Sequence, residues 1–279
     1  MTTITYNPAS DAAGLPGYRQ PQRVTQVRVF RTEWTKLRTQ PSAFWTLLSA
    51  VILVVGFGIG YSLLRVARPP HGAAAIASFD PAAISLSGVQ LAQIAVGVLG
   101  VLLITSEYAT GLIRTTFAAV PRRLPVLWAK AGLLAATITV VSVPAAFAAF
   151  AGGQSILARQ HLSVPFSQPG VSRAVIGSAL YLAVIGLLGL GLGAVIRNAA
   201  GGIAALFGLL YGLPLAANFL PGSMATDVSK FLPANAGQAV TSVHPDPTML
   251  QPWTGFGVLC LYAAVVLALS AARMRRGDA

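Results

Sequence analysis

Six long runs of uncharged, apolar residues dominate the sequence. They lie near residues 42–64, 84–104, 131–150, 174–196, 199–220 and 254–272. An α-helix rises 1.5 Å per residue, so about 20 such residues cross the ~30 Å hydrocarbon core of a bilayer. The alternating segments of about ten residues that mark a membrane barrel are absent. The pattern predicts an all-α integral membrane protein with a six-helix transmembrane domain over residues 41–276. Only Arg197 and Asn198 separate the fourth and fifth runs, which predicts a tight helical hairpin.

The segment before the first run has a different pattern. Apolar residues recur there every three or four positions, at Val24, Val27, Phe30, Trp34 and Leu37, and basic residues occupy the other faces. A basic amphipathic helix that carries Trp and Phe suits a membrane interface, and we predict such a helix over residues 23–40. A soluble helix packed on another domain is the alternative. Residues 1–22 are rich in Pro, Gly, Ala and Ser, and we expect a disordered cytoplasmic tail. The first apolar run begins too far from Met1 for a signal peptide, so we expect it to stay as an anchor.

Composition and charge support the membrane prediction and orient it. Only 9% of the 279 residues are charged, against roughly 25% in soluble domains. The net charge of +12 comes from basic residues between the runs, so topology explains it better than nucleic-acid binding. With both termini cytoplasmic, five of the 19 basic residues lie outside: Arg65, Arg68, Arg159, Arg173 and Lys230. The other 14 lie inside, as the positive-inside rule requires. The Ala-, Gly- and Pro-rich composition suggests the cell (inner) membrane of a bacterium.

No motif for catalysis, cofactor binding or metal binding occurs in the sequence. There is no phosphate-binding Gly-x-x-x-x-Gly-Lys loop, no His-Glu-x-x-His and no Gly-x-Ser-x-Gly. Cys260 is a lone cysteine, and the three histidines have no ligand spacing. We therefore expect a protein that is not an enzyme, with no catalytic, cofactor-binding or metal-binding residues.

The interiors of the six runs offer few polar groups. They lack Asp, Glu, Lys, Arg and His, which argues against a proton-driven carrier. Gln90, Gln93 and Asn218 are the candidates for a substrate path, and hydrogen bonds between helices are their other interpretation. The glycine pairs Gly56/Gly60, Gly189/Gly193 and Gly208/Gly212 have the spacing of close helix contacts.

The longest predicted inner loop, residues 105–123, contains apolar residues without an apparent place to bury them. Thr110 can cap a short helix that Pro121 stops, and on it Leu112/Thr116 and Ile113/Phe117 are neighbours four apart. Such a helix fits a groove on a soluble partner. Folding of the loop against the inner helix ends of the same chain is the alternative.

Three segments give the chain a resemblance to a known family. Residues 31–42 (RTEWTKLRTQPS), 105–117 (TSEYATGLIRTTF) and 197–202 (RNAAGG) resemble the connecting helix, the coupling helix and the turn before the fifth span in type-2 permeases of ATP-binding-cassette (ABC) transporters. With the six-span layout, the resemblance covers residues 22 to 276.

The resemblance implies a permease subunit that is driven by a separate ATPase. Two ATPase copies would carry ATP and Mg²⁺, and a second permease subunit, identical or homologous, would complete the transporter in the lipid membrane, without nucleic acid. The coupling residues would be Glu107, Tyr108, Thr110, Gly111, Leu112, Arg114 and Phe117. The connecting helix would carry Glu33, Trp34 and Lys36, with Glu33 and Lys36 spaced to pair.

The resemblance also suggests what the transporter does. Residues 221–252 would form short helices over an outer gate. The family mostly exports, and uncharged spans suggest hydrophobic or amphipathic cargo such as a drug, lipid or peptide. A secondary carrier or channel that works without an ATPase, and a non-transporting membrane module, are the alternatives.

Overall fold

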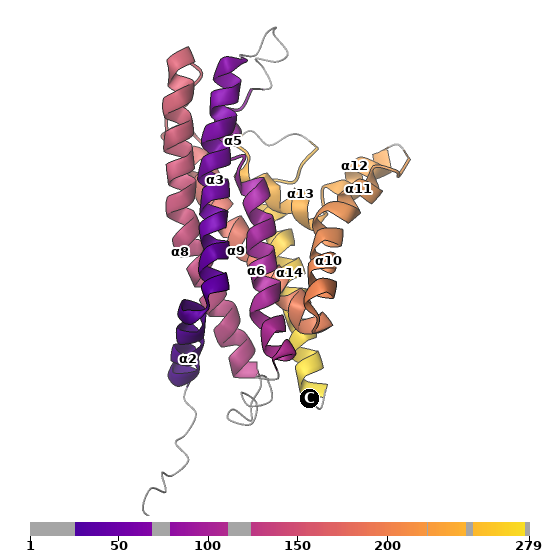
Figure 1. Cartoon of the computed structure of the whole chain (residues 1–279). Coiled ribbons are helices and arrows are strands. Elements are labelled where there is room, and N and C mark those ends of the chain that lie inside the picture. Colours follow the sequence, from indigo (N-terminus) through magenta and orange to yellow (C-terminus); the bar gives the residue numbers. More distant parts are fainter. Residues whose placement is uncertain (1–25, 69–78, 111–123, 222, 244–247, 277–279) are drawn as a thin grey trace, which may run out of the picture.

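The computed structural model describes residues 26–68, 79–110, 124–221, 223–243 and 248–276, and all regular elements within these ranges are helical. They are α2 (Gln26–Thr39), α3 (Pro41–Ala67), α5 (Pro81–Ser85), α6 (Val89–Ala109), α8 (Leu124–Leu157), η1 (Ala158–Gln160), α9 (Val171–Ile196), α10 (Ala199–Phe207), the π-helical η2 (Gly208–Gly212), α11 (Leu213–Ala217), α12 (Ser223–Ser229), α13 (Pro233–Gln238), η3 (Ala239–Thr241) and α14 (Pro252–Arg276). Figure 1 shows them as an elongated bundle.

Six helical segments in the described ranges are long and apolar enough to cross a membrane. They are Pro41–Ala67, Val89–Ala109, Leu124–Gln160, Val171–Ile196, Ala199–Ala217 and Pro252–Arg275. The protein is therefore a multi-pass, all-helical membrane protein, as the apolar runs predict. Trp45, Trp128 and Trp253 are all more than half exposed near the first residues of α3, α8 and α14, where an aromatic belt would lie.

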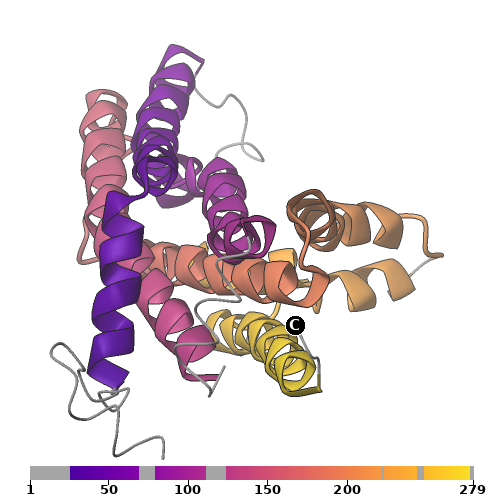
Figure 2. The ribbon, with the colours of Figure 1, turned by 60° about the horizontal axis from the view of Figure 1, so that its bottom comes forward.

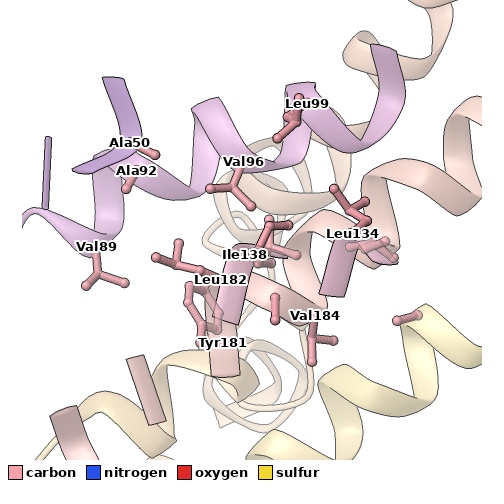
Figure 3. Packing of buried hydrophobic residues seen from close by; sticks show 14 of the residues in the cluster. Ala50, Val89, Ala92, Val96, Leu99, Leu134, Ile138, Tyr181, Leu182 and Val184 are labelled. Atoms are coloured by element: carbon pink, nitrogen blue, oxygen red, sulfur yellow. The ribbon is translucent and has the colours of Figure 1, made fainter. Parts of the chain in front are cut away.

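The core forms around α9, which lies at the centre of the bundle between α6, α8 and α14 (Figure 2). Figure 3 shows Val96 of α6 and Ile138 of α8 near Leu182 of α9. Helices α6 and α9 approach so closely that a Cβ on Gly189 would overlap the carbonyl oxygen of Gly97. Gly193 likewise faces Val101 of α6, so this glycine pair makes the predicted close contact.

Two expectations about the helices require correction. The third span was expected near residues 131–150, but α8 begins at Leu124 and ends at Leu157, so Lys130 lies inside a helix. The second span was expected near residues 84–104, but α6 runs from Val89 to Ala109 and contains Glu107, after the separate short helix α5. Both differences have one cause: hydropathy marks the uncharged middle of a helix, whereas backbone hydrogen bonding continues into its charged ends.

The remaining predicted elements are present with local irregularities. α9 ends at Ile196 and α10 begins at Ala199, which forms the predicted tight hairpin. Arg197 has a left-handed backbone (φ 61°), and the Asn198 side chain caps α10 by accepting from Gly201 N at 2.9 Å. The fifth span is interrupted by η2, where Gly208 and Gly212 have no neighbour within 4 Å of an added Cβ. Gly56 and Gly60 are equally open, so these two pairs make no close helix contact within the described chain.

Helix α2 lies across the bundle rather than along it. It is foreshortened in Figure 1 and extended in Figure 2, whereas the long helices are extended in Figure 1. It lies at the same end of the bundle as the C-terminal end of α14 (Figure 1). The apolar face predicted for α2 depends mainly on residues whose side chains lie outside the described ones, and it stays a prediction.

Candidate functional site: a buried charge cluster

Four charged side chains from three helices meet at the end of the bundle that carries α2. Lys130 Nζ of α8 donates to Glu33 Oε2 of α2 at 2.6 Å and to Glu107 Oε1 of α6 at 3.1 Å. Lys36 Nζ of α2 donates to Glu33 Oε1 at 2.9 Å and to Glu107 Oε1 at 3.0 Å. We call Glu33, Lys36, Glu107 and Lys130 the charge cluster. Two carboxylates and two ammonium groups make it formally neutral.

Three of the four side chains are buried. Side-chain exposure is 2% for Lys130, 4% for Glu33 and 9% for Glu107, against 36% for Lys36. Removing a charge from water costs several kcal/mol unless a partner compensates. Each buried carboxylate here has two ammonium partners, and Lys130 has two carboxylates. The cluster is therefore a set of mutually dependent charges, in which loss of one leaves another uncompensated in a low-dielectric place.

Electrostatic interactions keep both cluster residues of α2, Glu33 and Lys36, ionised. Burial of the Glu33 carboxyl opposes its ionisation, but Lys130 and Lys36 outweigh burial and hold the pKa of Glu33 below its usual value. Burial also opposes the charge of Lys36, but its hydrogen bonds to Glu33 and Glu107 raise the pKa of this ammonium group. Both side chains therefore carry their charges at neutral pH.

The local helical structure explains how these side chains converge. Glu33 and Lys36 are three residues apart and share a face of α2, so they pair as their spacing predicts. Glu107 lies in the last turn of α6 and Lys130 in the second turn of α8. Because α6 ends at Ala109 and α8 begins at Leu124, Glu107 and Lys130 flank residues 111–123 on either side. The cluster thus ties α2 to both ends of that segment.

A cavity of about 220 Å³ adjoins the cluster. Its lining includes all four charged residues, together with Gln40, Ser106 and Thr110. Glu107 Oε2 is buried and has no hydrogen-bond partner among the described residues. A buried carboxylate oxygen normally has a donor, so this side of Glu107 is the place where the cluster can accept a further hydrogen bond.

The other residues predicted for ATPase coupling divide into two groups. Tyr108 and Thr110 are described. The Arg197 guanidinium lies 5.3 Å from the Tyr108 ring centroid. Thr110 follows α6 as its C-cap, and its hydroxyl donates to Ser106 O at 2.8 Å. Gly111, Leu112, Arg114 and Phe117 lie outside the described residues, as does most of the expected coupling helix. Trp34 of α2 is 46% exposed and takes no part in the cluster.

The three candidates for a substrate path, Gln90, Gln93 and Asn218, do not lie in one site. Gln93 is buried on α6, accepts from the Tyr181 hydroxyl of α9, and donates to Tyr211 Oη of η2 at 2.9 Å. Gln90 Oε1 accepts from Gln238 Nε2 of α13 at 2.9 Å. Asn218 is exposed after α11 and is not part of this network. Gln90 and Gln93 therefore bond between helices, and this polar network links α6, α9, η2 and α13.

Sequence reasoning missed two participants. Lys130 entered the prediction only as one of the 14 basic residues assigned to the inside. A single lysine within the apolar stretch 124–150 is nevertheless a signal that its ammonium group needs a partner. Arg197 was assigned to the turn, and its position over Tyr108 joins two of the segments that carry the family resemblance. Within the described residues no group of three or more His, Cys, Asp or Glu side chains could hold a metal ion.

Comparison of the chain with protein-family models and with curated proteins finds no match.

Proposed function

We propose that this chain is the membrane subunit of an ABC transporter, with ATP hydrolysis on a separate subunit. The observation that carries the proposal is the charge cluster, which ties α2 to the last turn of α6 and the second turn of α8. These two turns flank residues 111–123, the segment that a soluble ATPase would contact. A movement imposed on that segment would then reach α2, α6 and α8 together.

The physical role of the cluster in this scheme is to make three helix ends move as a unit. Separating Lys130 from its two carboxylates would leave charges uncompensated in a low-dielectric place. A movement that keeps the four charges together therefore costs less free energy than a movement that separates them. Beyond it, α6 packs tightly on α9 through glycine contacts, so displacement of α6 would pass to the centre of the bundle.

The proposed setting follows from the distribution of charge. Both termini would be cytoplasmic, in the inner membrane of a bacterium, because this orientation assigns 14 of the 19 basic residues to inner segments. The cargo would be a hydrophobic or amphipathic compound, since the interiors of the six apolar runs carry no charged side chain. It would leave the cell, because the family that the chain resembles mostly exports. A second permease subunit would complete the translocation path, and α12 and α13 would lie over its outer gate.

The experiment purifies the tagged full-length chain from its native membranes and measures ATP hydrolysis in the preparation. We expect an ABC ATPase to co-purify, and its turnover to fall when Gly111 or Arg114 is replaced. Deletion of residues 110–120 is expected to abolish coupling. Full ATPase coupling after that deletion would refute the proposal. Arg159→Gln, which changes an exposed arginine on η1, is the control and should leave turnover unchanged.

One observation favours a second candidate, a carrier that works without an ATPase. Glu107 Oε2 is buried beside the cavity without a partner among the described residues, which is a position that a proton or cation could use. The purified chain alone, reconstituted in vesicles under a pH gradient, separates the two. Gradient-driven flux that Glu107→Gln abolishes would support the carrier, and absence of flux would favour the ABC permease.

A further inference from the structure

A second hollow lies between α2 and α8, on the far side of Leu133 from the charge cluster. Its volume is about 510 Å³, within the roughly 300–1,000 Å³ typical of ligand pockets. One wall is a single face of α8, formed by Leu133, Ala136, Thr137, Val140 and Val141. The other wall is Arg31 and Trp34 of α2. We call this hollow the α2–α8 groove.

The α8 wall of the groove is apolar and open. Val140 is 72% exposed, although it lies within the span Leu124–Gln160. In a membrane protein such a face meets acyl chains, and a hollow of this size can accommodate a chain more specifically than a flat helix surface does. Thr137 also lines the groove, but its Oγ1 is buried. The α8 wall therefore offers apolar groups to an acyl chain.

The α2 wall of the groove is basic. Arg31 is exposed at its mouth, and Arg38, seven residues later, falls on the same helical face as Arg31 and Trp34. Neither arginine forms a salt bridge with a described residue. Guanidinium groups bind phosphate through two parallel N–H donors. Because α2 lies across the end of the bundle (Figures 1 and 2), a membrane boundary at that end would bring lipid headgroups to α2.

We propose that the α2–α8 groove binds one phospholipid with an anionic headgroup. The acyl chain lies along the α8 face, and the Arg31 guanidinium binds the phosphate. Trp34 packs at the boundary between headgroup and chain, where its amphipathic ring is suited to lie. The inference needs only that the chain spans a membrane and does not depend on an ATPase partner.

The position of the groove gives the bound lipid a structural consequence. Leu133 lines both the α2–α8 groove and the cavity beside the charge cluster. A lipid in the groove therefore contacts one side of α2, through Arg31 and Trp34. The other side of α2 is bound through Glu33 and Lys36 to the rest of the charge cluster. The lipid would thus stabilise the packing of α2 against α8 in addition to the charge cluster. Loss of the lipid would weaken the attachment of α2 to the bundle.

The test uses Trp34 as the reporter of occupancy. The full-length chain with Trp45, Trp128 and Trp253 replaced by Phe is reconstituted in vesicles that contain increasing fractions of brominated phosphatidylglycerol or brominated phosphatidylcholine. Bromine on the acyl chain quenches a tryptophan that it contacts. We expect half-maximal quenching of Trp34 at an about five-fold lower fraction of the anionic lipid, the preference that one favourable basic contact gives.

Matched variants separate a binding site from general lipid contact. Arg31→Gln is expected to remove the preference for phosphatidylglycerol, whereas Arg159→Gln, an exposed arginine on η1, should keep it. A chain with Trp45 alone, 65% exposed on α3, should be quenched equally by both lipids.

Two results would overturn the proposal. One is equal quenching of Trp34 by the two lipids, which would mean annular contact only. The other is a preference that survives Arg31→Gln. As an independent readout, phosphatidylglycerol should raise the Tm of the wild-type chain in detergent more than phosphatidylcholine does, and Arg31→Gln should abolish that difference. A Tm difference that survives Arg31→Gln would count against the site in the same way.

Discussion

Lys130 and Glu33 are 97 positions apart in the chain, yet Lys130 Nζ lies 2.6 Å from Glu33 Oε2 in the most buried contact of the charge cluster. The pair fastens a helix that lies across the membrane end to a helix that crosses the membrane. Glu107, which also contacts Lys130, adds a third helix to the same junction. This junction is the structural basis of the proposed function.

Replacement of Lys130 by Met should destabilise the fold strongly. The change removes a buried cation and leaves Glu33 and Glu107 with Lys36 as their only partner in the cluster. Breaking a buried pair in this way costs about 3–5 kcal/mol. Lys230→Met removes a pair in which Asp227 is 66% exposed, and should cost no more than about 1 kcal/mol. Denaturant titration in detergent micelles measures both free energies of unfolding; equal losses would contradict the account.

The stability that Glu33 contributes should disappear in acid. Its pKa is below the usual value of 4.5 in the folded chain, so the contribution is present above about pH 4.5 and is lost as pH falls through the lower folded pKa. Lys36 has a raised pKa, so its contribution is present below its usual 10.5 and is lost as pH rises beyond the folded value. The stability difference between wild type and Glu33→Gln should therefore be constant near neutrality and shrink below about pH 4.5. A difference that grows in acid would contradict this sign.

The contact between α6 and α9 should be sensitive to a single methyl group. Gly189→Ala places a Cβ against the carbonyl of Gly97, and overpacking of this kind costs about 1–3 kcal/mol. Gly208→Ala, also inside a span but with open space around it, should be neutral or should stabilise by up to about 1 kcal/mol. Thermal unfolding of the two variants in detergent tests this. If they behave alike, α6 and α9 do not pack as described.

Replacement of Tyr181 by Phe should lower the stability of the fold if Gln93 has a structural role. The change removes the hydroxyl that donates to Gln93 Oε1, and an unpaired buried group costs about 1–3 kcal/mol. Tyr262→Phe is the control, because Tyr262 of α14 is half-buried and makes no hydrogen bond with a described residue. A large loss for Tyr181→Phe alone supports a structural role for Gln93 between helices. Similar small losses for both would return Gln93 to the candidates for direct contact with cargo.

The apolar runs were sufficient to predict the six membrane-spanning helices, because length and hydropathy are local properties. The contacts between helices were not predictable in the same way. Glu33 and Lys36 could be paired from their spacing, but nothing periodic connects either of them to Lys130 or Glu107. The same spacing of glycines produced a tight contact at Gly189/Gly193 and none at Gly208/Gly212, because the facing helix decides the outcome.

The ends of the helices were the second feature that could not be predicted from the sequence. Hydropathy stops where charges begin, so Glu107 and Lys130 were assigned to a loop although both lie in helical turns. Their charges are tolerated there because each compensates another, which only the three-dimensional arrangement reveals. The residues that form the candidate site are therefore those that a search for uncharged spans leaves out.

The most direct test of the account measures ATP hydrolysis by the co-purified complex in vesicles, with wild-type, Lys130→Met and Arg159→Gln chains. Variants are compared at a temperature where all remain folded and retain the ATPase subunit. If the charge cluster transmits movement between the ATPase and the bundle, Lys130→Met should lower turnover at least about ten-fold, the effect of about 1.4 kcal/mol on a barrier. Arg159→Gln, which changes an exposed arginine on η1, should leave turnover unchanged. Wild-type turnover in a folded Lys130→Met complex, or a chain that never associates with an ATPase, would contradict the central claim.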